Sequence, residues 1–355
     1  MTNRREFFKR AATTVGVVFT SCGLLDQRAK AQAPKRREVS VGGKRIRTID
    51  VHAHCVIAEA QTMMGKPIPA GGENLPGSEN VVADSRFKTM DEWGIDMQAL
   101  SINASWYDLG ADMMAKVIPL QNEKLAELCS KHKDRFVAFA SVALQFPEMA
   151  AQQLEEGVKK YGLRGAAIGG HVNGDECSNP KYDPFWRKAE ELGCVVFVHP
   201  QGIPEMSKRL AGNGGLTNVI GNPLETTIFL EHMIYDGKLD QFPGLKICAA
   251  HSGGYFPSYA ARSNYGCVHF PGSCDKLRKK PAEYLRQLYF DSMVFTSEGL
   301  RHLVAECGVS QIMVGTDYPF AWSNTAIDHV LNTPSLSNAE KRAILGENAA
   351  RLLKI

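Results

Sequence analysis

The chain has 355 residues, of which 44% are hydrophobic and 22% are charged, a composition typical of a globular protein with a large core. Disorder, collagen and coiled coil are therefore excluded. The formal net charge is +3, and the basic surplus lies in residues 1–33, so the rest of the chain lacks the basic surface needed to bind nucleic acid or an anionic membrane.

Residues 1–33 are predicted to be a twin-arginine export signal, which would direct the protein to the periplasm. Arg4–Arg5 precedes an uncharged, mildly apolar run over residues 11–25, and Ala31–Ala33 has the small-residue pattern found before a cleavage site. The alternatives are a basic amphipathic helix and a lipid anchor on Cys22. No later segment has the roughly 20 apolar residues that span a bilayer, so we expect no stable membrane insertion once the signal is removed.

From residue 45 onward, short apolar runs rich in β-branched residues alternate with longer amphipathic stretches. This alternation predicts repeated strand–helix units around a parallel sheet. Eight units within residues 34–355 predict a single domain with the α/β fold of a (β/α)₈ TIM-type barrel. The predicted strands are 47–51, 97–102, 136–142, 165–169, 194–199, 245–250, 288–291 and 312–316. The predicted helices are 114–133, 147–160, 183–192, 224–239, 297–307, 338–344 and 347–353.

An open, doubly wound sheet is the alternative fold for such a pattern. No Gly-x-Gly-x-x-Gly motif follows an early strand, and the pair Gly169–Gly170 is too short for a dinucleotide-binding loop. The least regular stretch, at about 55–83, follows the first predicted strand. In a barrel it would overhang the catalytic face, so we predict an insertion loop there and consider it a candidate lid.

The nine cysteines include no Cys-x-x-Cys pair, which argues against a zinc ribbon or thioredoxin-type redox chemistry. Several of them, such as Cys194 and Cys248, lie in apolar strand-like runs. We predict that these are free thiols that behave as small buried hydrophobes.

Polar side chains at strand ends carry the functional prediction. His52 and His54 end the first predicted strand and point to the same side, because they are two residues apart. Alone, such a pair is better explained by two structural histidines. However, His199, His251 and Asp317 each follow a later strand, and the carboxyl ends of barrel strands meet at one mouth. Imidazoles with one carboxylate suit Zn²⁺ or Mn²⁺.

With these five residues and the motifs around them, the chain resembles the amidohydrolase-related metal-dependent family, and within it the aminocarboxymuconate-semialdehyde decarboxylase branch. The resemblance covers most of the chain after residue 45. The motifs that carry it are Asn122-Glu123-x-Leu125-Ala126, Asp134-Arg135-Phe136-Val137, Val198-His199-Pro200, Pro223-x-Glu225-Thr226-Thr227, Phe242-Pro243-x-Leu245-Lys246, His251-x-Gly253-Gly254-x-x-Pro257, Gly315-Thr316-Asp317-Tyr318-Pro319 and Gly346-x-Asn348-Ala349.

The resemblance implies that one divalent metal, Zn²⁺ in the first place and Mn²⁺ in the second, is bound by four side chains. The implied ligands are His52, His54, His199 and Asp317. It further implies that His251 and Asp317 are catalytic, with His251 as acid or base beside metal-bound water.

The resemblance also implies that Arg86 and Arg262 bind substrate carboxylates, and that Arg262 comes from the neighbouring protomer of a homodimer. Without it, Arg86 would be interpreted as a solvated helix residue and Arg262 as a structural ion-pair partner. The chain departs from the branch at Gln201, where the branch carries tryptophan. This departure predicts a different carboxylic substrate.

We therefore predict a metal-dependent decarboxylase, a carbon–carbon lyase that acts on a small unsaturated or aromatic carboxylic acid. One alternative is a hydrolase of a lactone, ester or amide that uses the same metal site. Another is an exported binding protein without catalysis.

Overall fold

All eight strands expected for a barrel are present in the computed structural model, which describes residues 36–68, 82–320, 322 and 325–355. Residues 36–355 form one compact unit. The export signal, Cys22 and residues 69–81 of the expected insertion loop lie outside the described residues. The strands are β3 (Ile49–His54), β4 (Met97–Ser101), β5 (Phe136–Ala138), β6 (Gly165–Ile168), β9 (Val195–Val198), β10 (Lys246–Ala249), β11 (Tyr289–Asp291) and β12 (Ile312–Met313).

The eight strands close into a parallel ring. Strands β3, β4 and β5 pair in that order, and β6, β9, β10, β11 and β12 pair in a second parallel run. Parallel bridges join the two runs, from Ala140 to Ala166 at one gap and from Asp50 to Val314 at the other. The (β/α)₈ barrel predicted from the sequence is confirmed.

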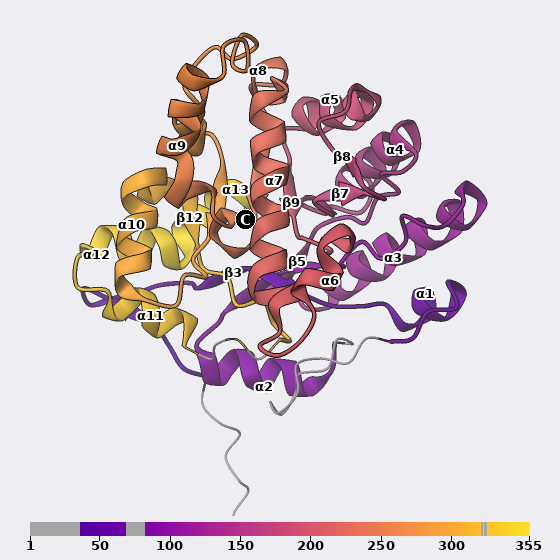
Figure 1. Ribbon diagram of the computed structural model, residues 1–355. Helices are drawn as coiled ribbons and strands as arrows, with labels where there is room; N and C mark the ends of the chain where they lie inside the picture. Colours follow the sequence, from indigo (N-terminus) through magenta and orange to yellow (C-terminus); the bar gives the residue numbers. More distant parts are fainter. Residues whose placement is uncertain (1–35, 69–81, 321, 323–324) are drawn as a thin grey trace, which may run out of the picture. The chain divides into compact units, whose positions relative to one another are not determined.

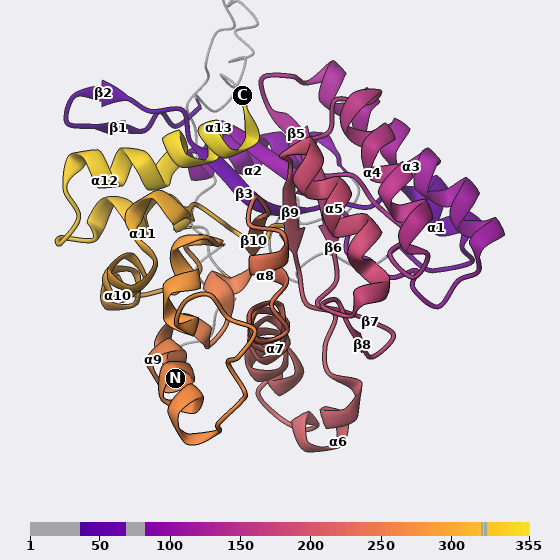
Figure 2. The same ribbon diagram turned by 90° about the horizontal axis from the view of Figure 1, so that it is seen from above.

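Helices surround the strands, as Figure 1 and the view from above in Figure 2 show. Most expected helices are present, but the run predicted at 224–239 is two helices, because Gly237 has φ 78°, a left-handed conformation that ends the first. These helices are α3 (Ala111–Lys131), α4 (Pro147–Lys159), α5 (Asp183–Leu192), α7 (Asn222–Tyr235), α8 (Lys238–Gln241), α10 (Ser297–Cys307), α12 (Asn338–Arg342) and α13 (Asn348–Leu353).

Other elements were not expected from the sequence. The stretch predicted as an irregular insertion loop contains the helix α1 (Ala58–Met63). The further unexpected elements are α2 (Asp84–Trp93), α6 (Ser207–Leu210), α9 (Phe256–His269), α11 (Ala326–Asn332) and the hairpins β1 (Ser40–Val41) with β2 (Lys44–Arg45) and β7 (His171–Val172) with β8 (Asp175–Glu176). Among the described residues, no helix combines the length and apolar character needed to cross a membrane.

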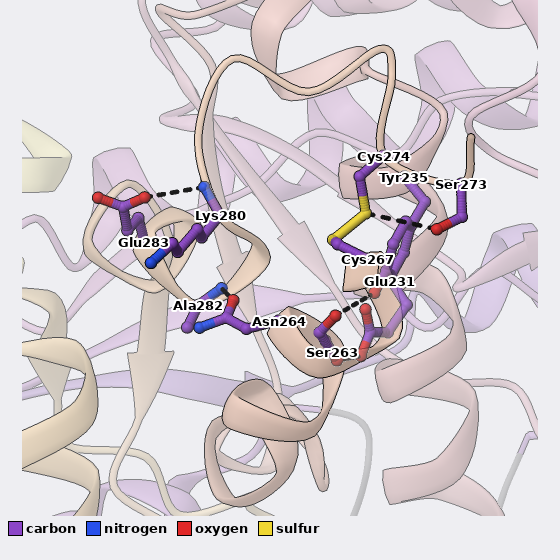
Figure 3. The surroundings of a disulfide bond; sticks show 10 residues. All are labelled: Glu231, Tyr235, Ser263, Asn264, Cys267, Ser273, Cys274, Lys280, Ala282 and Glu283. Atoms are coloured by element: carbon purple, nitrogen blue, oxygen red, sulfur yellow. Dashed lines mark hydrogen bonds between the residues drawn. A yellow bond between two sulfur atoms is a disulfide. The ribbon is translucent and has the colours of Figure 1, made fainter. Parts of the chain in front are cut away.

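The cysteines divide into buried thiols and one disulfide. Cys194 and Cys248 are buried and free, as predicted. Cys267, in the last turn of α9, forms a disulfide with Cys274, which follows the helix (Figure 3). The sequence did not predict this pair. Their spacing of seven residues fits neither a metal-binding nor a redox motif, so no sequence signal distinguished this pair.

Candidate metal centre

A β-bulge in β3 positions the first two histidines. The pairing of β3 with β4 shifts register between residues 50 and 53, so β3 carries one extra residue. Ile49 and Val51 pack in the barrel interior, and the ring of His52 lies 5.1 Å from that of the interior residue Phe197. An extra residue in a strand re-aims the side chains beyond it. The bulge thus lets His52 and His54 face the interior above an apolar floor.

The five side chains predicted at strand ends converge at the barrel mouth. The Oδ1 atom of Asp317 lies 3.1 Å from His52 Nε2, 2.9 Å from His54 Nε2 and 3.8 Å from His199 Nε2, and its Oδ2 atom lies 3.6 Å from His251 Nε2. Ligand atoms of His52, His199, His251 and Asp317 all lie within 4.8 Å of one another. His54 joins them, with its Nε2 3.0 Å from His52 Nε2.

The Nδ1 atoms of His52 and His54 contact two residues that were not predicted from the sequence. His52 Nδ1 lies 2.7 Å from Asp291 Oδ2, and His54 Nδ1 lies 2.8 Å from Ser101 Oγ. Such contacts fix ring orientation and leave Nε2 for a metal. Asp291 and Ser101 end the seventh and second barrel strands, so the strand-end position that marked Asp317 would also have found Asp291.

Backbone groups in turn hold Asp291. Its carboxylate accepts hydrogen bonds from the N–H groups of His251, Ser252 and Met293, at 2.8, 2.8 and 3.0 Å. The turn that carries His251 is thereby tied to the carboxylate that orients His52. Displacement of Asp291 would disturb both histidines.

Asp50 ties three strands together behind the centre. This buried carboxylate accepts hydrogen bonds from His52 N–H at 3.0 Å, Gln98 Nε2 at 3.1 Å and Thr316 Oγ1 at 2.6 Å. Burial raises its pKa to about 6, although these hydrogen bonds act in the opposite direction. Asp50 therefore fixes the strand ends that carry the first ligands and Asp317.

Burial and charge set the protonation of the cluster. Burial lowers the pKa of His54 to about 4 and that of His199 well below its usual range, which leaves both rings neutral and able to bind a metal. Burial also opposes a charge on His52, yet Asp317 and Asp291 raise its pKa to about 10. Burial would raise the pKa of Asp317, but the surrounding histidines, His52 first, hold it well below its usual range.

The donor set fits a divalent metal. Both ring nitrogens of His199 are buried without a hydrogen-bond partner among the described residues, as is Nδ1 of His251. Buried polar atoms of this kind need a partner, and a cation would supply one at His199 Nε2. Several imidazoles with one carboxylate suit Zn²⁺ and Mn²⁺.

The backbone at two of these side chains is strained. His251 has φ 53° and Asp317 has φ 58°, values that are uncommon for residues other than glycine. Such strain clusters where the fold must aim a functional side chain. His251 lies two residues beyond the end of β10, and Asp317 lies four residues beyond the end of β12.

Arg86 lies behind His54, and its side chain is fully buried. One guanidinium nitrogen donates to the carbonyl oxygen of His54 and another lies 3.2 Å from Gln98 Oε1. The group also stacks on Tyr318, 4.3 Å from the ring centroid. The interpretation as a solvated residue is wrong, because tertiary packing covers this face of α2. Its predicted contact with a substrate carboxylate stays a prediction.

Arg86→Met is expected to destabilise the protein by about 2–3 kcal/mol, because charge-assisted hydrogen bonds in the interior are lost. Urea unfolding would measure the change. Arg301→Met is the control, since the exposed side chain of Arg301 pairs with the exposed side chain of Glu298, a contact worth less than about 0.5 kcal/mol. Unchanged stability with a raised KM for a carboxylate substrate would instead favour the clamp role.

Arg262 lies on the exposed face of α9 and borders a groove with Glu231, Tyr259 and Phe270. It is absent from the residues that line the cavities at the metal centre. Within one chain, the structure does not bring Arg262 to the five clustered side chains.

The loop after His199 is held against two glycines. The backbone N–H of Gln201 donates to both carboxylate oxygens of Glu225, at 3.0 Å to Oε1 and 2.8 Å to Oε2. The backbone N–H of Gly202 also donates to Glu225. A Cβ atom at Gly170 would lie 2.6 Å from Glu225 Oε1, and one at Gly169 would lie 2.3 Å from Gln201 Nε2. The glycine pair therefore makes room for the side chains that position this loop.

Gly170→Ala is expected to lower the free energy of unfolding by about 1–3 kcal/mol, because overpacking displaces the buried Glu225. Thermal unfolding would measure the loss. Gly110→Ala is the control, since its added Cβ would meet no atom within 4 Å. Equal effects of the two substitutions would contradict this explanation of the glycine pair.

Two cavities flank the cluster. One, of about 410 Å³, is lined by His199, Asp317, Gln201 and Phe320 among others. The other, of about 230 Å³, is lined by His251 together with apolar and aromatic side chains. The cluster thus adjoins space for a small molecule on two sides.

The fold and this cluster define a class: barrel proteins with a histidine–carboxylate cluster, suited to a divalent metal, at the carboxyl ends of the strands. The family described as Amidohydrolase matches residues 49–355. The chain belongs to this family.

Named relatives and a solved structure support the same branch. The chain is 30% identical over 274 residues to 2-amino-3-carboxymuconate-6-semialdehyde decarboxylase of Dictyostelium discoideum, covering 76% of each chain. It is 30% identical over 291 residues to gamma-resorcylate decarboxylase of Rhodococcus jostii, covering 77% of this chain and 88% of the relative. A dihydroxybenzoic acid decarboxylase from Polaromonas, solved with manganese and 2-nitroresorcinol, is 27% identical with a TM-score of 0.76, covering 86% of this chain and 96% of that one.

Proposed function

We propose that this chain is a metal-dependent decarboxylase that releases CO₂ from an aromatic carboxylic acid. The observation that carries the proposal is the convergence of four imidazoles and one carboxylate beside two cavities at the barrel mouth. The names of the relatives support the reaction class, since they are decarboxylases of carboxylic acids.

The proposed ligands are His52, His54, His199 and Asp317, and the bound ion would hold the substrate and stabilise negative charge that develops when the carboxylate leaves. The bond to the carboxylate carbon breaks, its electron pair stays on the ring carbon, and that carbon takes up a proton. His251 Nε2 lies 3.6 Å from Asp317 Oδ2. This pair is placed to pass a proton at the mouth of the barrel.

The ion is proposed to be Zn²⁺, with Mn²⁺ as the alternative. The donor set suits both ions, and the Polaromonas structure contains manganese. Metal analysis of the purified protein, followed by reconstitution of chelator-treated protein with each ion, tests the choice. Restoration of activity by Mn²⁺ and not by Zn²⁺ would overturn the first assignment.

The reaction can be tested with hydroxybenzoic acids in ¹⁸O-labelled water. We expect release of one CO₂ per product formed. Lactones, esters and amides of aromatic acids, assayed in parallel, test the alternative, since their hydrolysis would place ¹⁸O in the acid product without release of CO₂. Absence of CO₂ with every acid, in metal-loaded protein, would contradict the decarboxylase proposal.

A homodimer is proposed through α9. Four large side chains on and just after this helix are exposed, by 59% at Tyr259, 68% at Tyr265, 73% at Val268 and 69% at Phe270. Tyr259, Tyr265 and Phe270 line one groove together with Arg262, and exposed apolar side chains gathered in this way favour an interaction site. A second copy would also bring its Arg262 toward the centre of its partner.

Mixing variants tests the shared site. Arg262→Ala and His251→Asn proteins should each be impaired alone, and mixed dimers should regain activity because one of their two sites then has both intact residues. A monomer in sedimentation analysis, or no regain after subunit exchange, would contradict the proposal.

Export through the twin-arginine signal is proposed on the pattern of residues 1–33. The disulfide between Cys267 and Cys274 supports it, because disulfides persist in oxidising compartments such as the periplasm. Replacement of Arg4 and Arg5 by lysine should retain the protein in the cytoplasm during cell fractionation. Unaltered distribution would contradict this route.

A further inference from the structure

One of the two cavities at the metal centre has an apolar wall that the chemistry described so far does not use. The cavity of about 230 Å³ that adjoins His251 is lined largely by apolar and aromatic side chains. They include Val219, Met293, Val294, Phe295 and Trp322. No lysine, arginine, aspartate or glutamate belongs to the described residues that line this cavity. Its wall therefore suits a hydrocarbon group rather than a charged one.

The second cavity, of about 410 Å³, differs in character. It adjoins His199 and Asp317, and carboxamide side chains provide much of its polar lining. Asn218 and Asn222 line both cavities, so the two cavities adjoin each other. A ligand held at the metal centre would meet polar groups on one side and apolar side chains on the other.

Phe295 is unfavourably placed in two respects. It is 54% exposed, and its φ of 57° is uncommon for residues other than glycine. Its ring lies 6.2 Å from that of Trp322, with 40° between the ring planes, and Trp322 and Val219 are exposed as well. Single exposed apolar side chains are ordinary, whereas several gathered around one cavity indicate a ligand-binding groove.

Hydrogen bonds on both sides fix the backbone of Phe295 between β11 and α10. The N–H of Val294 donates to the carbonyl oxygen of Ser292 at 2.9 Å, and the N–H of Thr296 donates to that of Val294 at 2.8 Å. Thr296 also caps α10, because its hydroxyl oxygen accepts from the N–H of Gly299 at 3.0 Å. The turn therefore holds the Phe295 ring at the cavity, and strain of this kind clusters at functional sites.

We propose that Phe295, with Trp322 beside it, determines substrate specificity by binding an alkyl substituent on the ring of the aromatic acid. This inference rests on the proposed function. The carboxylate of the acid would lie at the metal centre, and the alkyl group would lie in the apolar cavity. Each methylene removed from water strengthens binding about threefold. Acids with a short alkyl chain should therefore be preferred to acids without one.

Calorimetric binding of 2-nitrophenols to the metal-loaded full chain tests the proposal, since a nitro group has the shape of a carboxylate but cannot leave as CO₂. The compounds carry a methyl, ethyl or propyl group at each of the free ring positions in turn. At one position at least, the propyl compound should bind about tenfold more tightly than the methyl compound.

Substitutions of Phe295 locate the source of this gain. Phe295→Asn should reduce the tenfold gain to about threefold or less, and asparagine tolerates the positive φ, so the fold should be kept. Phe295→Leu keeps an apolar side chain and should retain about fivefold or more. Met63→Asn is the matched control and should leave the gain unchanged, because Met63 is exposed on α1 and lines neither cavity.

Affinity that does not rise with chain length at any ring position would overturn the proposal. So would a full gain in Phe295→Asn, a loss in Phe295→Leu as large as in Phe295→Asn, or an equal loss in Met63→Asn. These results are independent of turnover, because nitrophenols release no CO₂. Failure of the proposed function would appear instead as absence of CO₂ from the hydroxybenzoic acids that correspond to the nitrophenols that bind.

Discussion

Asp317→Asn is expected to lower metal affinity by at least about one hundredfold and to abolish detectable turnover. Asp317 is the acidic member of the cluster and contacts four imidazoles, so its loss removes both a ligand and the negative charge that compensates a divalent ion. Metal content after dialysis against a weak chelator, together with CO₂ release, would measure both effects.

The fold of this variant should be preserved, because asparagine has nearly the same volume. Circular dichroism of Asp317→Asn provides the control. Full metal occupancy with full activity in Asp317→Asn would show that Asp317 is neither a ligand nor a proton carrier.

His251→Asn is expected to retain the metal and to reduce kcat by about 10²- to 10⁴-fold, the usual contribution of a general acid or base. Metal content and CO₂ release are measured on the same preparation. His302→Asn, on α10, is the matched control and should leave both unchanged.

His54→Asn provides the comparison that assigns the ligands. The group of ligand atoms that lie within 4.8 Å of one another contains His251 and not His54, whereas His54 Nε2 lies only 2.9 Å from Asp317 Oδ1. We expect metal loss in His54→Asn and retention in His251→Asn. Equal metal loss in the two variants would make His251 a ligand and remove its assignment as acid or base.

The strands and the clustered side chains were predictable from sequence because both depend on local pattern. Apolar β-branched runs mark buried parallel strands, and a parallel barrel brings their carboxyl ends to one mouth. Polar residues directly after such runs, as at His199 and Asp317, therefore have to meet. The same rule, applied to Asp291, would have found the residue that orients His52.

Other features depend on contacts between distant segments and have no local pattern. The bulge in β3 is defined only by its register against β4. The burial of Arg86 depends on Tyr318, Gln98 and the carbonyl group of His54. The pairing of Cys267 with Cys274 depends on how the chain turns after α9. Charge and spacing alone carry none of this information.

Anomalous diffraction from a crystal of the metal-loaded protein, recorded at the absorption edge of the ion, tests the central assignment most directly. We predict one peak at about 2.0–2.2 Å from the Nε2 atoms of His52, His54 and His199 and from a carboxylate oxygen of Asp317. A peak elsewhere, or no peak in a protein that releases CO₂ from its substrate, would contradict the metal centre proposed for this barrel.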